Sequence, residues 1–281
     1  MDFNYEPYWD DFEASNGARE QNYMKILFRP GYSVQARELT QIQSIVQNQI
    51  KQFGNHMFRN GTSIYGGQVS VDRKIKYLKL QPTYDNLDVD PGDFLDRVIF
   101  NDIGTVTKRA KVIAVYDDEA TPTLMIRSIS GVEFTAGETI TTSTGYKAVV
   151  AEPVGVGSVA HIDQGVFYVS GYFVYVEPQS IVLVVDSPNP TFKIGLELDE
   201  TIVDESADGN LLDPAQESFN YQAPGAHRYR CTLNLSKRII DSIDDDRFFE
   251  LMRVENGNIT KVVQGTQYAA FEGLLARRTY D

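Results

Sequence analysis

Residues 158–188, SVAHIDQGVFYVSGYFVYVEPQSIVLVVDSP, decide the fold class that we predict for this chain. The stretch is rich in Val, Ile, Tyr and Phe, the residue types that favour strands. Ser170 and Gly171 interrupt it with a two-residue turn. We therefore predict two strong strands joined through Ser170 and Gly171, followed by a third. Four aromatic residues make this the most aromatic part of the predicted core: Tyr168, Tyr172, Phe173 and Tyr175.

Strand-like sequence extends from this stretch in both directions, from Asn60 to about residue 236. Between residues 94 and 152, five or six short segments recur about every ten residues between turn signals, which indicates a small barrel or sandwich. We predict a mainly β fold with one long N-terminal α-helix. Residues 59–93 and 153–236 would form a β-sandwich or barrel core, with a small β-barrel domain inserted at 94–152.

The predicted helix covers residues 31–58, GYSVQARELTQIQSIVQNQIKQFGNHMF. Ser33 is its predicted N-cap and Gly54 its predicted stop. Apolar residues recur at steps of three and four and so mark one stripe along the helix. The stripe consists of Leu39, Ile42, Ile45, Val46, Ile50 and Phe53.

The remaining faces of this helix carry the uncharged residues Gln41, Gln43, Gln47, Gln49 and Gln52. A solvated helix face more often carries charged residues. In a symmetric oligomer identical side chains meet, so like charges would repel where glutamines can hydrogen-bond to their own copies. This face is therefore a candidate subunit contact. The alternative is an amphipathic helix that packs against the β domain of its own chain.

Three further segments have the composition of contact surfaces. Residues 1–30 read as an extended aromatic arm whose rings dock on another surface. A polar loop from residue 204 to 228 is long enough to be functional or to pack against a neighbour. Residues 237–281 read as a linker or connector to a following module, with a hairpin turn at Asn256 and Gly257.

Composition excludes several broad classes. The chain of 281 residues has a net charge of −13, which argues against binding to nucleic acid or to anionic lipid. No apolar run approaches the roughly 20 residues that cross a bilayer. The amino end is acidic and aromatic, unlike a secretory signal. The single cysteine, Cys231, reads as a small buried apolar residue of a strand.

The sequence predicts no catalytic, cofactor or metal site. The histidines His56, His161 and His227 are far apart and lack the spacing of zinc ligands. Hydrolase elbows of the form GxSxG and phosphate-binding P-loops are absent from the sequence. A carboxylate pair for glycoside hydrolysis stays open as an alternative, since an acidic chain offers many pairs and nothing singles out one.

Three stretches together carry a resemblance to a known family. They are FNYEPYWDDFE at residues 3–13, the helix region from 28 to 62, and LLDPAQESFNYQAPGAHRYR at 211–230 before TLNLSK. The chain resembles the N-terminal domain of virion structural proteins of contractile-tailed bacteriophages. Such domains are found on baseplate, tail-fibre or fibre-adaptor subunits. In that family the domain heads a longer polypeptide, so we expect the chain to continue into further modules.

The resemblance implies a non-enzymatic part of a phage tail that is made in the host cytoplasm and joins a fibre or spike to the baseplate. Its partners would be other tail and baseplate proteins, and copies of itself, with a homotrimer favoured. The expected oligomer interface comprises Leu39, Ile42, Val46, Gln49, Ile50 and Phe53. The residues expected to dock on partners are Tyr5, Tyr8, Trp9, Phe12, Phe219 and Tyr221.

Two alternatives stay open at this point: a tail protein that cleaves host glycans, and one that binds host carbohydrate through the inserted β domain. The insert offers few aromatic residues for stacking on sugars: Phe100, Tyr116, Phe134 and Tyr146.

Overall fold

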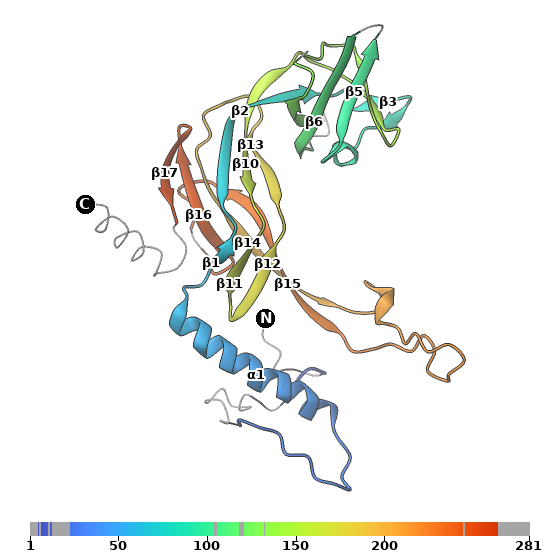
Figure 1. Cartoon of the computed structure of the whole chain (residues 1–281), viewed down its shortest axis with the longest axis vertical. Helices are drawn as coiled ribbons and strands as arrows, with labels where there is room; N and C mark the ends of the chain where they lie inside the picture. The colour runs from blue at the N-terminus through green and yellow to red at the C-terminus, as the bar shows by residue number, and fades with distance from the viewer. Residues whose placement is uncertain are drawn as a thin grey trace, which may run out of the picture.

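The computed structural model describes residues 5, 7–10, 12, 23–103, 106–117, 121–131, 133–243 and 245–263. Most of the described chain is β structure, and its one α-helix, α1 (Ala36–Met57), lies at the end of the molecule opposite the upper β module (Figure 1). The predicted fold class, mainly β with one long N-terminal helix, is confirmed.

Three sheets build the body. An eight-stranded sheet has the order β13-β10-β2-β7-β6-β5-β8-β9, a three-stranded sheet β1-β11-β12, and a four-stranded sheet β15-β14-β16-β17. The strands are β1 (Thr62–Gly66), β2 (Val69–Lys79), β5 (Val98–Ile103), β6 (Val106–Tyr116), β7 (Thr123–Ser128), β8 (Thr139–Thr142), β9 (Lys147–Val149), β10 (Gly155–Ile162), β11 (Gly165–Val169), β12 (Tyr172–Val176), β13 (Gln179–Val184), β14 (Phe192–Val203), β15 (Arg228–Arg238), β16 (Phe248–Glu255) and β17 (Asn258–Val262). A small ladder of β3 (Thr83–Tyr84) and β4 (Leu87–Asp88) precedes the 3-10 turn η1 (Pro91–Phe94).

The stretch 158–188 contains the predicted hairpin, since β11 and β12 pair from Gly165↔Val176 to Val169↔Tyr172. Ser170 and Gly171 have φ of 52° and 95°, as a two-residue type I′ turn requires. The structure has four strands in this region where we predicted three. β10 and β13 pair with each other in the large sheet, while the hairpin between them joins β1 in another sheet.

The main core lies between these sheets. Its buried residues come from seven strands: Ala160, Ile162, Phe167, Val169, Val174, Val176, Leu183, Ile194, Leu196, Leu198, Leu233, Leu235, Leu251, Met252 and Val254. Each such side chain contributes on the order of 1.5–3 kcal/mol when it leaves water. This core fixes β11, β12 and β15, the strands on which α1 and the long loop are mounted.

The predicted insert at 94–152 contains five strands, β5 to β9, and a second core of its own around Leu78, Phe94, Ile99 and Leu124. Its sheet is continuous with that of the body, because β7 pairs with the second half of β2. The 11-residue strand β2 therefore serves both cores: Val69 packs against the main core and Leu78 lies in the second. The predicted boundary at residue 94 therefore excludes the second half of β2, although that segment belongs to the inserted module.

The helix differs from its predicted bounds at both ends. It begins after Gln35, whose backbone N–H donates to Glu38 Oε2 at 2.9 Å, so Ser33 is not the N-cap. It ends at Met57, and Gly54 lies inside it, so Gly54 is not the stop. A Cβ built on Gly54 would lie 2.3 Å from the ring of Tyr168, and this close packing explains a glycine within the helix.

Candidate interaction surfaces

The apolar ridge of α1, which we define as Leu39, Ile42, Val46, Ile50 and Phe53, faces solvent. These side chains are 52%, 37%, 54%, 38% and 63% exposed, respectively. Of the predicted stripe, Ile45 is buried. An amphipathic helix that packed its apolar stripe on its own β domain would bury the ridge, so that alternative fails for the five ridge residues.

Polar contacts and a glycine hold α1 on the body. The hydroxyl of the fully buried Tyr168 donates at 3.0 Å to the carbonyl of Lys51 and lies 2.9 Å from Asn55 Oδ1. The Gln47 amide donates to the carbonyl of Gly171 at 2.7 Å. Because these contacts use the side of α1 that carries Gly54, the ridge points away from the sheets.

The glutamines divide between the two sides of the helix. Gln41 is buried and Gln47 is half-buried against the hairpin turn, so these two amides serve contacts within the chain. Gln43 and Gln52 are exposed, and Gln49, also exposed, has its amide nitrogen 3.7 Å from the Met24 sulfur. The expectation that all five amides flank a subunit contact is therefore wrong for Gln41 and Gln47.

Several residues that we expected to dock on a partner contact their own chain. The Tyr8 hydroxyl lies 2.5 Å from His227 Nδ1, and the Tyr5 ring packs edge-on to that of Tyr8 at 5.5 Å. Trp9 lies under the guanidinium of Arg37, 5.8 Å away. These contacts connect the amino-terminal segment to α1 and to the long loop. Phe12 is half-buried, and much of the predicted arm at 1–30 lies outside the described residues.

The long loop, residues 204–227 between β14 and β15, projects from the body as an ordered extension (Figure 1). Asp213 N–H donates to the Ala223 carbonyl and Gln222 N–H to the Asp213 carbonyl, each at 3.0 Å. Its tip carries the other two predicted docking residues. Phe219 is 111% exposed, which means that the ring touches almost nothing, and Tyr221 is 47% exposed.

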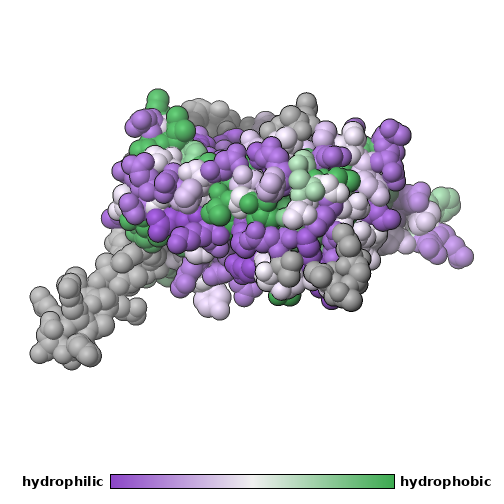
Figure 2. Space-filling view, turned by 90° about the horizontal axis from the view of Figure 1, so that it is seen from above, coloured by the Kyte–Doolittle hydropathy of each residue, from purple (hydrophilic) through white to green (hydrophobic). Residues whose placement is uncertain are grey.

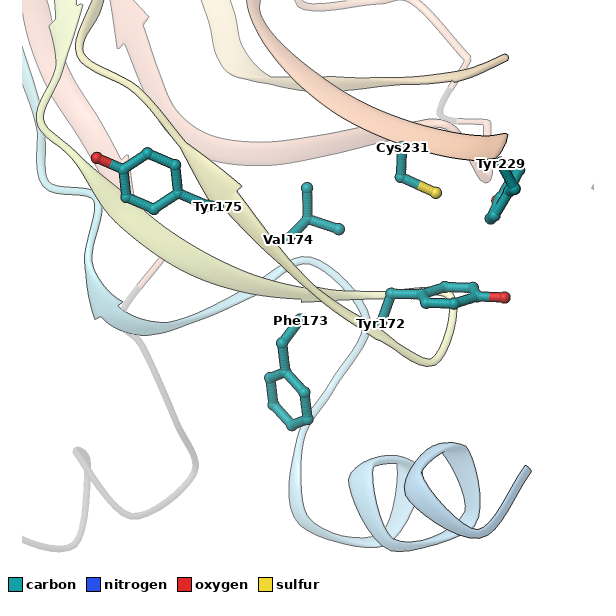
Figure 3. A pocket seen from close by; sticks show the side chains of 6 residues that line it. All are labelled: Tyr172, Phe173, Val174, Tyr175, Tyr229 and Cys231. Atoms are coloured by element: carbon teal, nitrogen blue, oxygen red, sulfur yellow. The ribbon is translucent and has the colours of Figure 1, made fainter. Parts of the chain in front are cut away.

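An aromatic hollow of about 320 Å³ lies between β12 and the start of β15 (Figure 3). It is lined by Tyr172, Phe173, Val174, Tyr175, Tyr229 and Cys231. The Tyr172 and Tyr229 rings lie 5.6 Å apart, and the Tyr229 hydroxyl donates to Glu200 Oε1 at 2.5 Å. The sequence carries no signal for this hollow, since 51 residues lie between the end of β12 and the start of β15, and the packing of the two strands is set by the main core.

Burial raises the pKa of the Cys231 thiol, so the half-buried thiol stays protonated at neutral pH. The prediction that Cys231 lies in a strand is confirmed by its place in β15, but the residue is only partly buried, so the prediction of a buried residue is wrong. Its side chain lies on one side of the hollow and the Tyr172 ring on the other.

The end of the molecule that carries the inserted module has a different surface. Seen from that end, the surface is mostly hydrophilic and its apolar residues form small separate groups (Figure 2). Within the described residues, no group of three or more His, Cys, Asp or Glu side chains is arranged to hold a metal ion. In the same part of the chain, no helix is both long and apolar enough to span a membrane.

Comparison with known proteins places the chain in one family. A family model described as a domain of unknown function, DUF4815, matches residues 6–93 and 115–281. The unmatched stretch, 94–114, covers β5 and most of β6 in the inserted module. Neither the curated proteins nor the solved structures contain a match to the chain. Because the matched residues make up most of its length, the chain belongs to the DUF4815 family.

Proposed function

We propose that the protein is a structural, non-enzymatic subunit of a contractile phage tail that joins a fibre or spike to the baseplate. It would do so as a homotrimer whose copies meet through the ridge of α1. The phage context is supported by the resemblance of three sequence stretches to virion structural proteins. The trimer is supported by the exposure of the α1 ridge to solvent, and this observation carries the proposal.

The ridge has the spacing of a coiled-coil seam. Leu39, Ile42, Val46, Gln49 and Phe53 follow one another at steps of three, four, three and four, as alternating a and d positions do. Gln49 would form one polar layer, and a polar residue at a single seam position fixes the register of the helices. Copies around a threefold axis would pair each such residue with its own equivalents.

Energetics favour association through a helix that is already fixed. In proteins most of the stability of a helix comes from tertiary packing, and less from the propensity of its residues. Here Tyr168 and Gln47 hold the helix on the body, so association costs little ordering of its backbone. Full burial of an apolar side chain contributes about 1.5–3 kcal/mol. Ridge side chains that are about half exposed would therefore contribute roughly 1 kcal/mol each on association.

The test combines oligomeric mass with a tail-assembly assay. Leu39→Ser with Val46→Ser should convert the trimer to monomers and prevent incorporation of the protein into tails, while leaving its circular dichroism unchanged. Ile129→Ser is the matched control, because Ile129 is also exposed (60%) but follows β7 in the inserted module. A double variant that stays trimeric would contradict the ridge as the interface.

The non-enzymatic assignment has a separate test. Purified protein incubated with host envelope glycans should release no oligosaccharide. Sustained release that depends on one carboxylate pair would overturn this part of the proposal and favour the glycan-cleaving alternative.

A further inference from the structure

We propose that Phe219, at the tip of the long loop, inserts into the aromatic hollow between β12 and β15 of a neighbouring copy. This inference rests on the proposed homo-oligomer and adds a second contact to it. Each copy would give one loop and receive another, in a head-to-tail ring around the axis formed by the α1 ridges.

The loop presents Phe219 on a supported tip. Leu212 and Pro224 form a bridge, and Gly225 N–H donates to the Leu211 carbonyl at 3.1 Å. Farther out, Ser218 N–H donates to the Ala215 carbonyl at 3.3 Å. The ring therefore stands at the end of a preorganised extension, and little conformational entropy is lost when it binds.

A chain cannot bring this ring into its own hollow with the loop as it stands. The hollow lies beside the base of the loop, since Tyr229 follows the loop by two residues. The loop projects away from the body (Figure 1), and its paired segments keep the tip away from the base. A Phe219 ring can therefore reach this hollow only from another copy.

The hollow suits a phenyl ring. The Tyr172 and Tyr229 rings offer faces and edges, which favour offset or edge-to-face contact with an incoming aromatic side chain. Val174 adds an aliphatic wall. Figure 3 shows Phe173 pointing down, on the side of β12 where α1 lies, and therefore away from Cys231 and Tyr229.

Charge favours this pairing. The loop at 204–227 contains five carboxylates and no lysine or arginine. The stem of Lys51 packs on Gly171, the residue before Tyr172, and Arg59 follows Phe58, whose ring lies 6.0 Å from that of Phe173 on the α1 side of β12. Lys51 and Arg59 are exposed and form no ion pair with a described residue. An acidic loop that arrives from a neighbour would meet these cations.

Donor and acceptor lie on different surfaces of the same chain, so the contact is heterologous. Heterologous contacts form open filaments unless the rotation between copies closes a ring. The threefold axis proposed for the α1 ridge supplies that closure. Three loops bound at once also reinforce one another, because each is tethered once the ring has formed.

The single native cysteine gives a direct test. Phe219→Cys places a thiol at the loop tip, and Cys231 lines the hollow. Oxidation of this variant should give covalent chains of two and three copies on a denaturing, non-reducing gel. Ala207→Cys, at the base of the same loop, is the matched control and should stay monomeric on that gel. Phe219→Cys combined with Cys231→Ser should lose the species of three copies.

The outcomes separate this inference from the proposed function. A trimer in solution that yields no Phe219→Cys cross-link, or only a link within one chain, overturns the inference and leaves the ridge interface standing. A cross-link that forms equally in the Ala207→Cys control would also overturn it, since it would report random collision. Phe219→Ala should weaken the trimer about tenfold or more, as loss of a central aromatic contact does. An unchanged trimer affinity for Phe219→Ala would contradict the insertion.

Discussion

Replacement of Gly54 by alanine sets two effects of opposite sign against each other. Alanine is a better helix former than glycine, by about 1 kcal/mol at an interior position. Its Cβ, however, would lie 2.3 Å from Tyr168 Cε2 and 2.6 Å from the Tyr168 hydroxyl oxygen. The Tyr168 side chain is fully buried and bonded to Lys51 and Asn55, so it has little room to move.

The clash with Tyr168 should outweigh the gain in helix propensity. Overpacking of this kind costs about 1–3 kcal/mol, and displacement of the tyrosine hydroxyl, which has one hydrogen to donate, would lose a hydrogen bond worth about 1 kcal/mol. After subtraction of the gain in helix propensity, we expect Gly54→Ala to lower the free energy of unfolding by roughly 2 kcal/mol. The loss should be local, with faster amide exchange in α1 and little change in β10 and β14.

Denaturant unfolding and amide hydrogen exchange would measure both effects. Gln43→Ala is the control, because Gln43 is an exposed residue of the same helix and its change should alter stability by only a few tenths of a kcal/mol. If Gly54→Ala were more stable than the parent by about 1 kcal/mol, helix propensity alone would account for it. The packing of α1 on Tyr168 would then be wrong.

Three further predictions concern other parts of the chain. Burial alone would raise the pKa of Glu138, but hydrogen bonds from Lys108 and Thr135 hold that pKa below its ordinary value. The resulting stabilisation of the fold is present above the unfolded-state pKa and is lost as the pH falls through the folded-state pKa. Glu138→Gln should therefore cost roughly 1–3 kcal/mol at neutral pH and flatten the acid limb of a stability–pH curve, and an unchanged limb would refute this. Cys231 should react with iodoacetamide more slowly at pH 8 than a free thiol does, because burial raises its pKa; an equal rate would contradict its setting. Gly257 has φ of 76° in the β16–β17 turn, a conformation that strains an alanine by roughly 1–2 kcal/mol. Gly257→Ala should therefore lower the melting temperature, and an unchanged melting temperature would argue against that turn.

The sequence was sufficient for those features that depend on local pattern. The hairpin turn at Ser170 and Gly171, the turn at Asn256 and Gly257, and the strands between 94 and 152 all follow from residue type and spacing. The hydroxyl of Ser33 predicts an N-cap at that residue, yet the pair Gln35 and Glu38 caps the helix.

Features that depend on distant contacts could not be predicted. Glycine commonly ends helices, so the sequence predicts a helix stop at Gly54, whereas the role of Gly54 depends on Tyr168, more than a hundred residues away. Likewise, the contact of Tyr8 with His227 joins residues 219 apart in sequence. The sharing of β2 between two cores also has no local signal, since it depends on the pairing of β2 with both β10 and β7.

The mass of the purified chain in solution tests the central claim most directly. Light scattering over a range of concentrations should give three times the chain mass of 31.6 kDa, and Leu39→Ser with Val46→Ser should reduce that value to one chain. A parent chain that stays at 31.6 kDa up to high concentration would contradict a trimer built on the α1 ridge.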